Sequence, residues 1–139
     1  YKKKFIIAPP GGKNFIHVKD AAYAVCQAIE KGRPGECYLL ANENMSYKAF
    51  YEKLIQVTGQ KSRIISIPKS VLLFIGRIGT GLVKMGIPVS AHYVNMQILC
   101  VKNYYSNAKA KAELDLPCHN ITLAIRDAEE WFLDKKMIS

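Results

Sequence analysis

Acidic residues are scarce in this sequence, and so are the residues that mark low-complexity chains. Its 139 residues hold 11 aspartates and glutamates against 20 lysines and arginines, with only 6 prolines and 9 glycines. This composition, with 50% hydrophobic residues, excludes a disordered or low-complexity chain. The length suits a single domain, residues 1–139, with its own hydrophobic core.

The four cysteines lack the spacing of a metal or redox site. No two form a CxxC pair, and no cysteine–histidine cluster has zinc-ligand spacing. The basic start at Tyr1–Lys4 is followed by too short an apolar run for a signal peptide. We therefore expect reduced thiols, no metal and a cytoplasmic protein.

The formal charge of +9 favours anionic partners such as nucleic acid, a membrane surface or phosphorylated small molecules. The lysines, however, are scattered along the chain and form no arginine–aromatic stripe of the kind that single-strand binders use. We therefore expect solvated lysines and no nucleic-acid surface.

The longest apolar run, Val71–Val89, is nearly long enough to cross a bilayer. A spanning helix needs about 20 apolar residues with few or no charges, whereas this run contains Arg77, Lys84, four glycines and a proline. We predict a glycine-loosened helix over an apolar pocket, continued as helix over Ala91–Cys100, and no membrane span. Contact with a membrane interface stays open as an alternative.

The other segments alternate between strand and helix patterns. Strands are predicted over Phe5–Ala8, Asn14–Val18, Glu36–Ala41 and Arg63–Ile67. Helices are predicted over residues 20–31, 47–58, 108–114 and 122–135. This order predicts an α/β fold, or α+β for the chain in isolation, with short strands and about five helices.

Capping residues define the first two of these helices. Asp20 is expected to cap the first helix, since its carboxylate can accept a backbone N–H of the first turn. Gly32 is expected to end that helix in a left-handed conformation. Ser46 and Gly59 mark the ends of the second helix.

Two short matches to dehydrogenase motifs fail on their context. Gly76–Gly81 (GRIGTG) lies within a helix-like stretch, whereas a pyrophosphate-binding loop needs its glycines between a strand and a helix. Tyr105–Lys109 is a literal YxxxK, but Tyr105 precedes the expected cap Ser106, so its side chain need not share a helix face with the lysine. Neither match is taken as a cofactor-binding or catalytic site.

The histidines form no Ser-His-Asp or Cys-His arrangement. His17 is expected to be packed or hydrogen-bonded, and His119 to lie in a loop. His92 and Tyr93 follow the apolar run and are candidates to line a pocket.

Two stretches resemble a known family. Residues 11–59 contain a strand reading "fIHVxDxA", a helix ending near a glycine and the pattern "GexYlLgnexxsxxe". Residues 106–132, SNAKAKAELDLPCHNITLAIRDAEEWF, match "SxAKAxxELgxxPxxxxxAIrDxxxWF". Both resemble the C-terminal half of extended short-chain dehydrogenases, the NAD-dependent epimerase/dehydratase family. The run Val71–Ile87 looks like its dihydroflavonol-reductase and hydroxysteroid-dehydrogenase branch.

This resemblance implies that the chain is the C-terminal, substrate-binding portion of a Rossmann-type enzyme. The N-terminal dinucleotide-binding domain, with its glycine-rich loop and catalytic Tyr-Lys pair, would lie outside this chain. The parent would be an NAD- or NADP-dependent oxidoreductase or epimerase acting on a sugar nucleotide or a hydrophobic hydroxy or keto substrate. The chain itself is expected to hold no catalytic or cofactor-binding residue and not to turn over alone.

The resemblance also implies candidate substrate-binding residues. In nucleotide-sugar epimerases an arginine at the position of Lys13 contacts the substrate's diphosphate, and a lysine offers only a point charge there. A second arginine motif of those enzymes has no counterpart in Ile98–Tyr105, which argues against a nucleotide diphosphate. The expected substrate-binding residues are Lys13, Asn14, Arg77, His92 and Tyr93.

Two expectations concern partners. The alanine-rich face of Asp20–Lys31 is expected to pack on the missing Rossmann domain, so the isolated chain should self-associate. The alternative function is a non-enzymatic basic module that binds a membrane surface or nucleic acid.

Overall fold

The strands of this chain form two small sheets, and most helices lie around them as an open frame. The computed structural model describes residues 4–138; the basic start Tyr1–Lys3 and Ser139 lie outside the described residues. The elements in chain order are β1 Phe5–Ala8, β2 Gly12–Phe15, α1 Val18–Lys31, β3 Glu43–Ser46, α2 Tyr47–Thr58, β4 Arg63–Ser66, α3 Lys69–Lys84, α4 Tyr93–Ile98, β5 Lys102–Asn103, α5 Ala108–Leu114 and α6 Ile121–Asp134. The predicted α/β class with short strands is confirmed.

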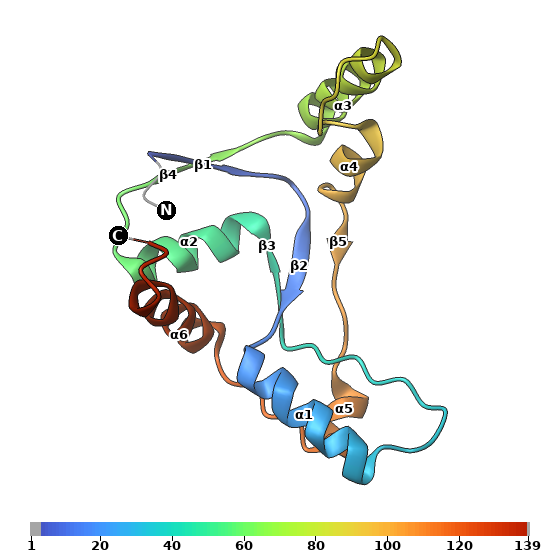
Figure 1. Ribbon diagram of the computed structural model, residues 1–139, viewed down its shortest axis with the longest axis vertical. Coiled ribbons are helices and arrows are strands. Elements are labelled where there is room, and N and C mark those ends of the chain that lie inside the picture. Colours follow the sequence, from blue (N-terminus) through green and yellow to red (C-terminus); the bar gives the residue numbers. More distant parts are fainter. Residues whose placement is uncertain (1–3, 139) are drawn as a thin grey trace.

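The two sheets are separate. β1 pairs in parallel with β4, with Phe5 opposite Arg63. β2 is the middle strand of the other sheet, between antiparallel β3 and parallel β5. Figure 1 shows α3 and α4 at one end of the molecule, α1 and α5 at the opposite end, and α2 beside α6.

A small core joins α1 and α5. Ala24 and Ala110 are both fully buried and pack with Leu116, because two small side chains let the helices approach closely. Val25 and Ile29, which share the predicted stripe with Ala24, lie outside this core and are 53% and 83% exposed. Only part of the alanine-rich face is therefore used within the described residues.

The start and end of α1 differ from the prediction. His17, not Asp20, is the N-cap, and its Nδ1 accepts a hydrogen bond from the backbone N–H of Lys19 at 3.0 Å. Asp20 lies in the first turn, where its carboxylate bonds to a distant segment instead. Gly32 has a φ of −65°, so it is not left-handed. Its glycine matters because a Cβ there would lie 2.2 Å from the carbonyl oxygen of Ala28.

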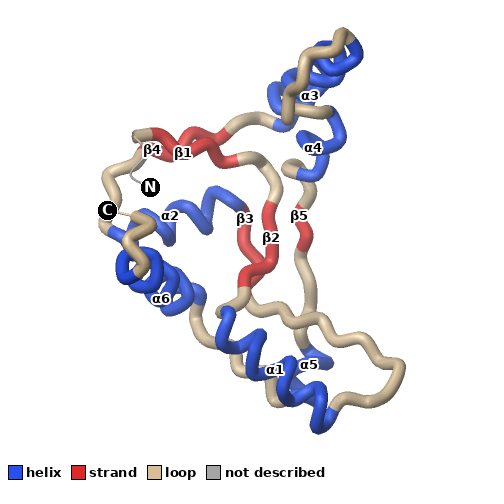
Figure 2. Tube along the Cα trace, viewed as in Figure 1, coloured by secondary structure: helices blue, strands red, loops and turns tan. Residues whose placement is uncertain are grey.

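The predicted strand Glu36–Ala41 is wrong. Within the described chain this segment pairs with no strand and is part of the long loop between α1 and β3 (Figure 2). Its alternating pattern arises because Tyr38 and Leu40 pack against the α1–α5 core. The predicted strand Asn14–Val18 is shifted two to three residues toward the N-terminus, to Gly12–Phe15.

Several local predictions are confirmed. The Ser46 hydroxyl accepts the N–H of Ala49 at 3.1 Å, and Gly59 ends α2 with a φ of +64°. α5 spans Ala108–Leu114 as predicted. The last helix begins at Ile121 behind the cap Asn120, whose Oδ1 accepts the N–H of Thr122 at 2.8 Å.

The glycines of GRIGTG serve helix packing. Leu72, Gly76 and Gly79 form the buried side of α3. A Cβ on Gly76 would lie 2.8 Å from Cα of Tyr93, and one on Gly79 would lie 2.0 Å from the carbonyl oxygen of Ala91. The rejection of this motif as a phosphate loop is confirmed, because the glycines lie inside a packed helix. Across residues 4–138 no helix has the length and apolar character that crossing a bilayer requires.

The glycine pair Gly11–Gly12 also lets two backbone segments lie close together. The N–H groups of Gly11 and Gly12 donate to the carbonyl oxygens of Leu99 and Val101, each at 3.1 Å. A Cβ on Gly11 would lie 2.5 Å from both oxygens. The pair thus fixes the segment between α4 and β5 against the start of β2.

Replacing Gly11 by alanine should therefore destabilise the fold. We expect Gly11→Ala to lower the free energy of unfolding by about 1–3 kcal/mol, because backbone atoms must move to admit the methyl group. Gly81→Ala is the matched control: a Cβ there meets nothing within 4 Å, so it should raise stability by up to about 1 kcal/mol through helix propensity. Urea unfolding of both variants would decide, and equal stability of Gly11→Ala and the parent would contradict the packing role.

Candidate functional site

A hollow between α3 and α4 is lined by two of the five predicted site residues, and a third adjoins it in the chain. Arg77, Thr80 and Tyr93 line a cavity of about 320 Å³. The guanidinium carbon of Arg77 lies 5.7 Å from the centroid of the Tyr93 ring, within range of a cation–π contact. His92 adjoins it as the N-cap of α4 and makes no side-chain capping bond.

Internal hydrogen bonds hold this hollow in shape. The Thr80 hydroxyl donates to the carbonyl oxygen of Gly76 at 2.9 Å and accepts the backbone N–H of Tyr93 at 3.0 Å. This links the two helices beside the Arg77 guanidinium. The hydroxyl is thus occupied within the chain, which leaves the Tyr93 ring and the guanidinium as the groups that a ligand can contact.

Lys13 and Asn14 lie elsewhere, on β2. Lys13 is exposed and stands opposite Met45 on β3. The amide of Asn14 is used within the chain: its Nδ2 donates to Asn44 Oδ1 at 2.8 Å, and its Oδ1 accepts the N–H of Asn42 at 2.9 Å. The five predicted residues therefore fall into two groups rather than one pocket edge.

The YxxxK match does not form a catalytic pair. Tyr105 precedes α5, and its backbone N–H donates to Asn44 Oδ1 at 3.1 Å. The Lys109 ammonium donates to the carboxylate of Glu36 and lies 4.6 Å from the centroid of the Tyr38 ring. Lys109 thus contacts the loop before β3 and not Tyr105, which agrees with the rejection of the YxxxK motif.

An apolar groove between α2 and α6 was missed. Its volume is about 580 Å³, and its lining includes the rings of Phe15 and Phe50, stacked at 4.1 Å between centroids. Leu54 and Phe132 lie along its sides. The sequence shows that both helices have an apolar stripe. It does not show that a groove remains between the two stripes.

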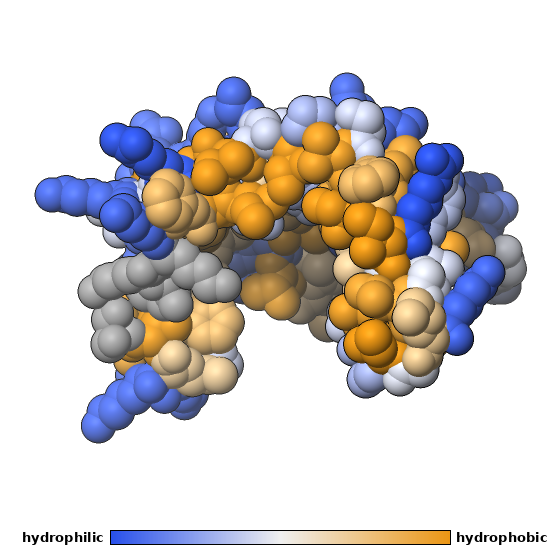
Figure 3. Space-filling view, turned by 90° about the horizontal axis from the view of Figure 1, so that it is seen from above, coloured by the Kyte–Doolittle hydropathy of each residue, from blue (hydrophilic) through white to orange (hydrophobic). Residues whose placement is uncertain are grey.

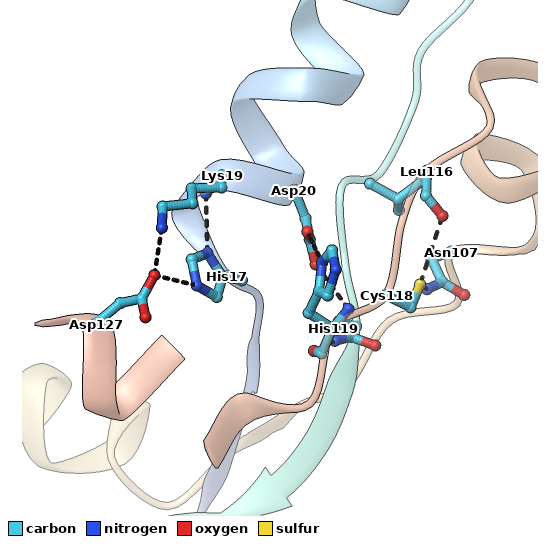
Figure 4. Close-up of polar contacts among 9 residues, drawn as sticks. His17, Lys19, Asp20, Asn107, Leu116, Cys118, His119 and Asp127 are labelled. Carbon is cyan, nitrogen blue, oxygen red and sulfur yellow. Dashed lines mark hydrogen bonds and ion pairs between the residues drawn. The ribbon is translucent and has the colours of Figure 1, made fainter. Parts of the chain in front are cut away.

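A polar cluster at the start of α1 joins it to α6 (Figure 4). His17 is 2% exposed; its Nε2 lies 3.2 Å from Asp127 Oδ2, off the line of a hydrogen bond. Lys19 Nζ donates to the same oxygen at 2.5 Å. Because Nδ1 of His17 accepts the Lys19 N–H, neutral His17 carries its proton on Nε2, toward Asp127.

The Lys19 hydrogen bond shifts the Asp127 carboxyl. It is the main cause that holds the pKa of Asp127 below its ordinary value; burial opposes the shift, while the charge of Lys19 and the neighbouring His17 ring add to it. The same hydrogen bond raises the pKa of Lys19. The pair is therefore fully ionised at neutral pH.

Asp20 makes a second link in this region. Its carboxylate, 1% exposed, accepts the backbone N–H of His119 at 2.9 Å and lies 2.5 Å from His119 Nδ1. The imidazole of His119 is largely exposed, in the loop before α6 as predicted. No spacing pattern could have revealed this pair, since 99 positions separate its members.

The described residues do not fit a metal ion or a dinucleotide. In residues 4–138 no three His, Cys, Asp or Glu side chains are grouped so that they could hold a metal. The N–H groups of Gly11 and Gly12 already donate to Leu99 and Val101, and GRIGTG lies inside α3. Neither glycine group can therefore donate freely to a pyrophosphate.

The chain is similar to part of larger proteins. No protein-family model matches it. It is 29% identical over 126 residues to a "Putative dihydroflavonol 4-reductase" of Synechocystis sp., which covers 87% of this chain and 37% of that protein. It is 24% identical over 132 residues to "Sterol demethylase protein B" of Methylococcus capsulatus, which covers 93% of this chain and 40% of that protein. The chain thus spans about two fifths of the length of these relatives.

Solved structures show the same fold. The protein gox2253 matches with a TM-score of 0.79 at 25% identity, over 99% of this chain and 41% of that one. A nucleoside-diphosphate-sugar epimerase from Pseudomonas aeruginosa matches with a TM-score of 0.67 at 20% identity, over 98% and 39%; at this identity the match concerns the fold alone. The resemblance to part of the NAD-dependent epimerase/dehydratase family, on its dihydroflavonol-reductase-like branch, is confirmed.

The Asp127 cluster generates a pH prediction. Because the pKa of Asp127 is lower in the folded chain than in the unfolded one, its ion pair stabilises the fold above the unfolded pKa, and this contribution is lost as the pH falls through the folded pKa. Asp127→Asn should therefore be less stable than the parent at neutral pH, and the two should converge as the pH falls below the ordinary pKa of an aspartate.

Denaturant unfolding over this pH range measures the effect. Asp134→Asn, on the same helix, is the control, since its carboxylate reaches only Lys135 at 3.9 Å. It should track the parent throughout. A stability difference between Asp127→Asn and the parent that stays constant in acid would refute the ion-pair account.

Proposed function

We propose that this chain is the substrate-binding portion of an NAD(P)-dependent oxidoreductase that acts on hydrophobic hydroxy or keto compounds. The observation that carries the proposal is the similarity, over 87% and 93% of the chain, to proteins named for dihydroflavonol and for sterol. Both names denote ring compounds with a hydroxyl or keto group. A nucleotide sugar has weaker support, since the epimerase match concerns the fold alone.

The α3–α4 hollow supports the same substrate class. Arg77 is the one cation among the residues that line it, and it is paired with the Tyr93 ring. A flat ring compound can stack on such a tyrosine and place a polar edge near the guanidinium. A diphosphate carries two phosphate groups and is bound best by several forked donors. The hollow offers one.

The exposed area of the chain supports the idea that the rest of the protein packs on it. The chain exposes 9338 Å², whereas a compact monomer of 15.6 kDa exposes about 7,200 Å². The excess of about 2,000 Å² is larger than the roughly 800 Å² that each partner buries in a standard interface. In the proposal, a dinucleotide-binding domain covers part of this surface, and an isolated chain self-associates through it.

The division of labour follows from what this chain holds. The nicotinamide, NAD or NADP, would be bound by the rest of the protein and would exchange hydride with the carbinol or keto carbon. The residues here would bind and orient the substrate: the Tyr93 ring by stacking, the Arg77 guanidinium by its charge, with His92 at the edge. Replacing these residues would change KM more than kcat, since groups that bind substrate and transition state equally lower KM without raising kcat.

Steady-state kinetics of the full-length protein would test this. With NAD(P)H we expect reduction of a dihydroflavonol or a keto-steroid and no turnover of a nucleoside-diphosphate sugar. Tyr93→Ala should raise KM for the ring compound about tenfold, with a smaller change in kcat, because about 1–2 kcal/mol of stacking is lost. Tyr23→Ala, at a half-exposed tyrosine on α1, should leave KM unchanged. Turnover of the nucleotide sugar alone would overturn the proposal.

A further inference from the structure

The outer face of α3 carries an apolar stripe that α4 leaves exposed. Its members are spaced i, i+3, i+4 and i+7, the spacing of one helical face, and Phe74 and Ile78 are 62% and 50% exposed. The stripe consists of Val71, Phe74, Ile75 and Ile78. It is distinct from the buried side of the helix, formed by Leu72, Gly76 and Gly79. α3 is therefore apolar on two sides, only one of which is packed.

Three basic residues of α3 accompany this stripe, and none of them has an acidic partner within residues 4–138. Residues 53–112 contain nine lysines and arginines and not a single aspartate or glutamate. Arg77 and Lys84, seven positions apart, share a side of α3, and Lys69 begins the helix. None of the three makes an ion pair with any residue of 4–138.

This stripe stands at an end of the molecule where a flat surface can reach it. Figure 1 shows α3 at the end opposite α1 and α5. Figure 3, seen from the α3 end, shows apolar residues gathered on the near face with hydrophilic ones toward the outer edge. Val94 and Ile98 of the neighbouring α4 are exposed as well.

We propose that the outer face of α3, with α4 beside it, docks on a bilayer of anionic lipid. Interfacial helices combine an apolar face that enters the headgroup boundary with basic residues that contact lipid phosphates. The 16 residues of α3 extend about 24 Å, too short to span a bilayer, so the helix would lie in the plane of the surface. Its lysines and arginine would stay at the phosphate level.

The charge distribution favours lipid over a second copy of this chain. A two-fold contact through this face would bring one acid-free basic surface against another, which costs free energy. Anionic lipid supplies the missing negative charge. Docking goes beyond the proposed oxidoreductase function, although it would bring the Arg77–Tyr93 hollow to the surface into which hydrophobic ring compounds partition.

Sedimentation of the chain with vesicles tests the apolar stripe. We expect binding to vesicles of equal parts phosphatidylcholine and phosphatidylglycerol, and much weaker binding to phosphatidylcholine alone. Phe74→Gln/Ile78→Gln should lower the partition coefficient on the anionic vesicles at least about tenfold per residue. Val25→Gln/Ile29→Gln, an exposed pair four positions apart on α1, is the matched control and should bind as the parent does.

A charge pair tests the lipid headgroup. Lys69→Gln/Lys84→Gln should lower binding to the anionic vesicles about thirtyfold, since each basic residue near the surface contributes about 1 kcal/mol. Lys61→Gln/Lys111→Gln, outside α3, should have little effect. Added salt should weaken binding of the parent more than that of the α3 charge variant.

Three results would overturn the proposal. The first is no binding to the anionic vesicles. The second is an equal loss of binding in the α1 control, which would indicate non-specific adhesion. The third is self-association, by light scattering, that Phe74→Gln/Ile78→Gln abolishes while vesicle binding persists, since this would assign the face to a protein contact. None of these measurements needs turnover, so a failure here is distinct from failure of the proposed activity.

Discussion

The close approach of Gly11 and Gly12 to the segment after α4 is the contact on which the arrangement depends. α3 packs chiefly on α4, and the chain after α4 meets the sheet through two backbone hydrogen bonds from Gly11 and Gly12. A Cβ on Gly11 would lie 2.5 Å from both acceptor oxygens. Because Gly11 and Gly12 carry no side chains, their backbone reaches the chain after α4 directly, and these two hydrogen bonds help to set where the α3–α4 unit stands. The position of the Arg77–Tyr93 hollow and of the outer face of α3 therefore depends on this glycine contact.

The carboxylates of Glu43 and Asp20 hold the start of α6 and the loop before it. Glu43 accepts the N–H of Ile121 and the Lys53 ammonium, each at 2.8 Å, while Asp20 accepts His119. Burial raises the pKa of Glu43, but the hydrogen bonds from Lys53 and Ile121 outweigh it, and the pKa lies below its ordinary value. The start of α6 is thus tied to β3 and α1 by charged acceptors. The rest of the helix leaves an apolar groove beside α2.

Features that depend on neighbouring residues, such as helix ends, can be predicted from this sequence. Contacts between residues far apart in the chain cannot. The cap Ser46 and the stop Gly59 act within their own helix, so α2 was predicted. Its position predicts Asp20 as a cap, whereas its actual partner, His119, is 99 positions away. Arg77 and Tyr93 were both candidates and do meet, since adjacent helices carry them. Asn14 was also a candidate, but its amide is occupied by Asn42 and Asn44, which no spacing reveals.

Glycine clusters in this chain show why motif and context must be weighed together. A phosphate loop needs backbone N–H groups that are free to donate. At Gly11–Gly12 they are taken by carbonyls, and at Gly76 and Gly79 the missing side chains admit α4. The two sides of α3 therefore have different roles. The glycine side packs against α4 and shapes the hollow beside Tyr93, whereas no residue of the outer stripe lines that hollow. Changes at Phe74 can therefore alter docking while ligand contact at Tyr93 persists, which makes the two proposals independent in experiment.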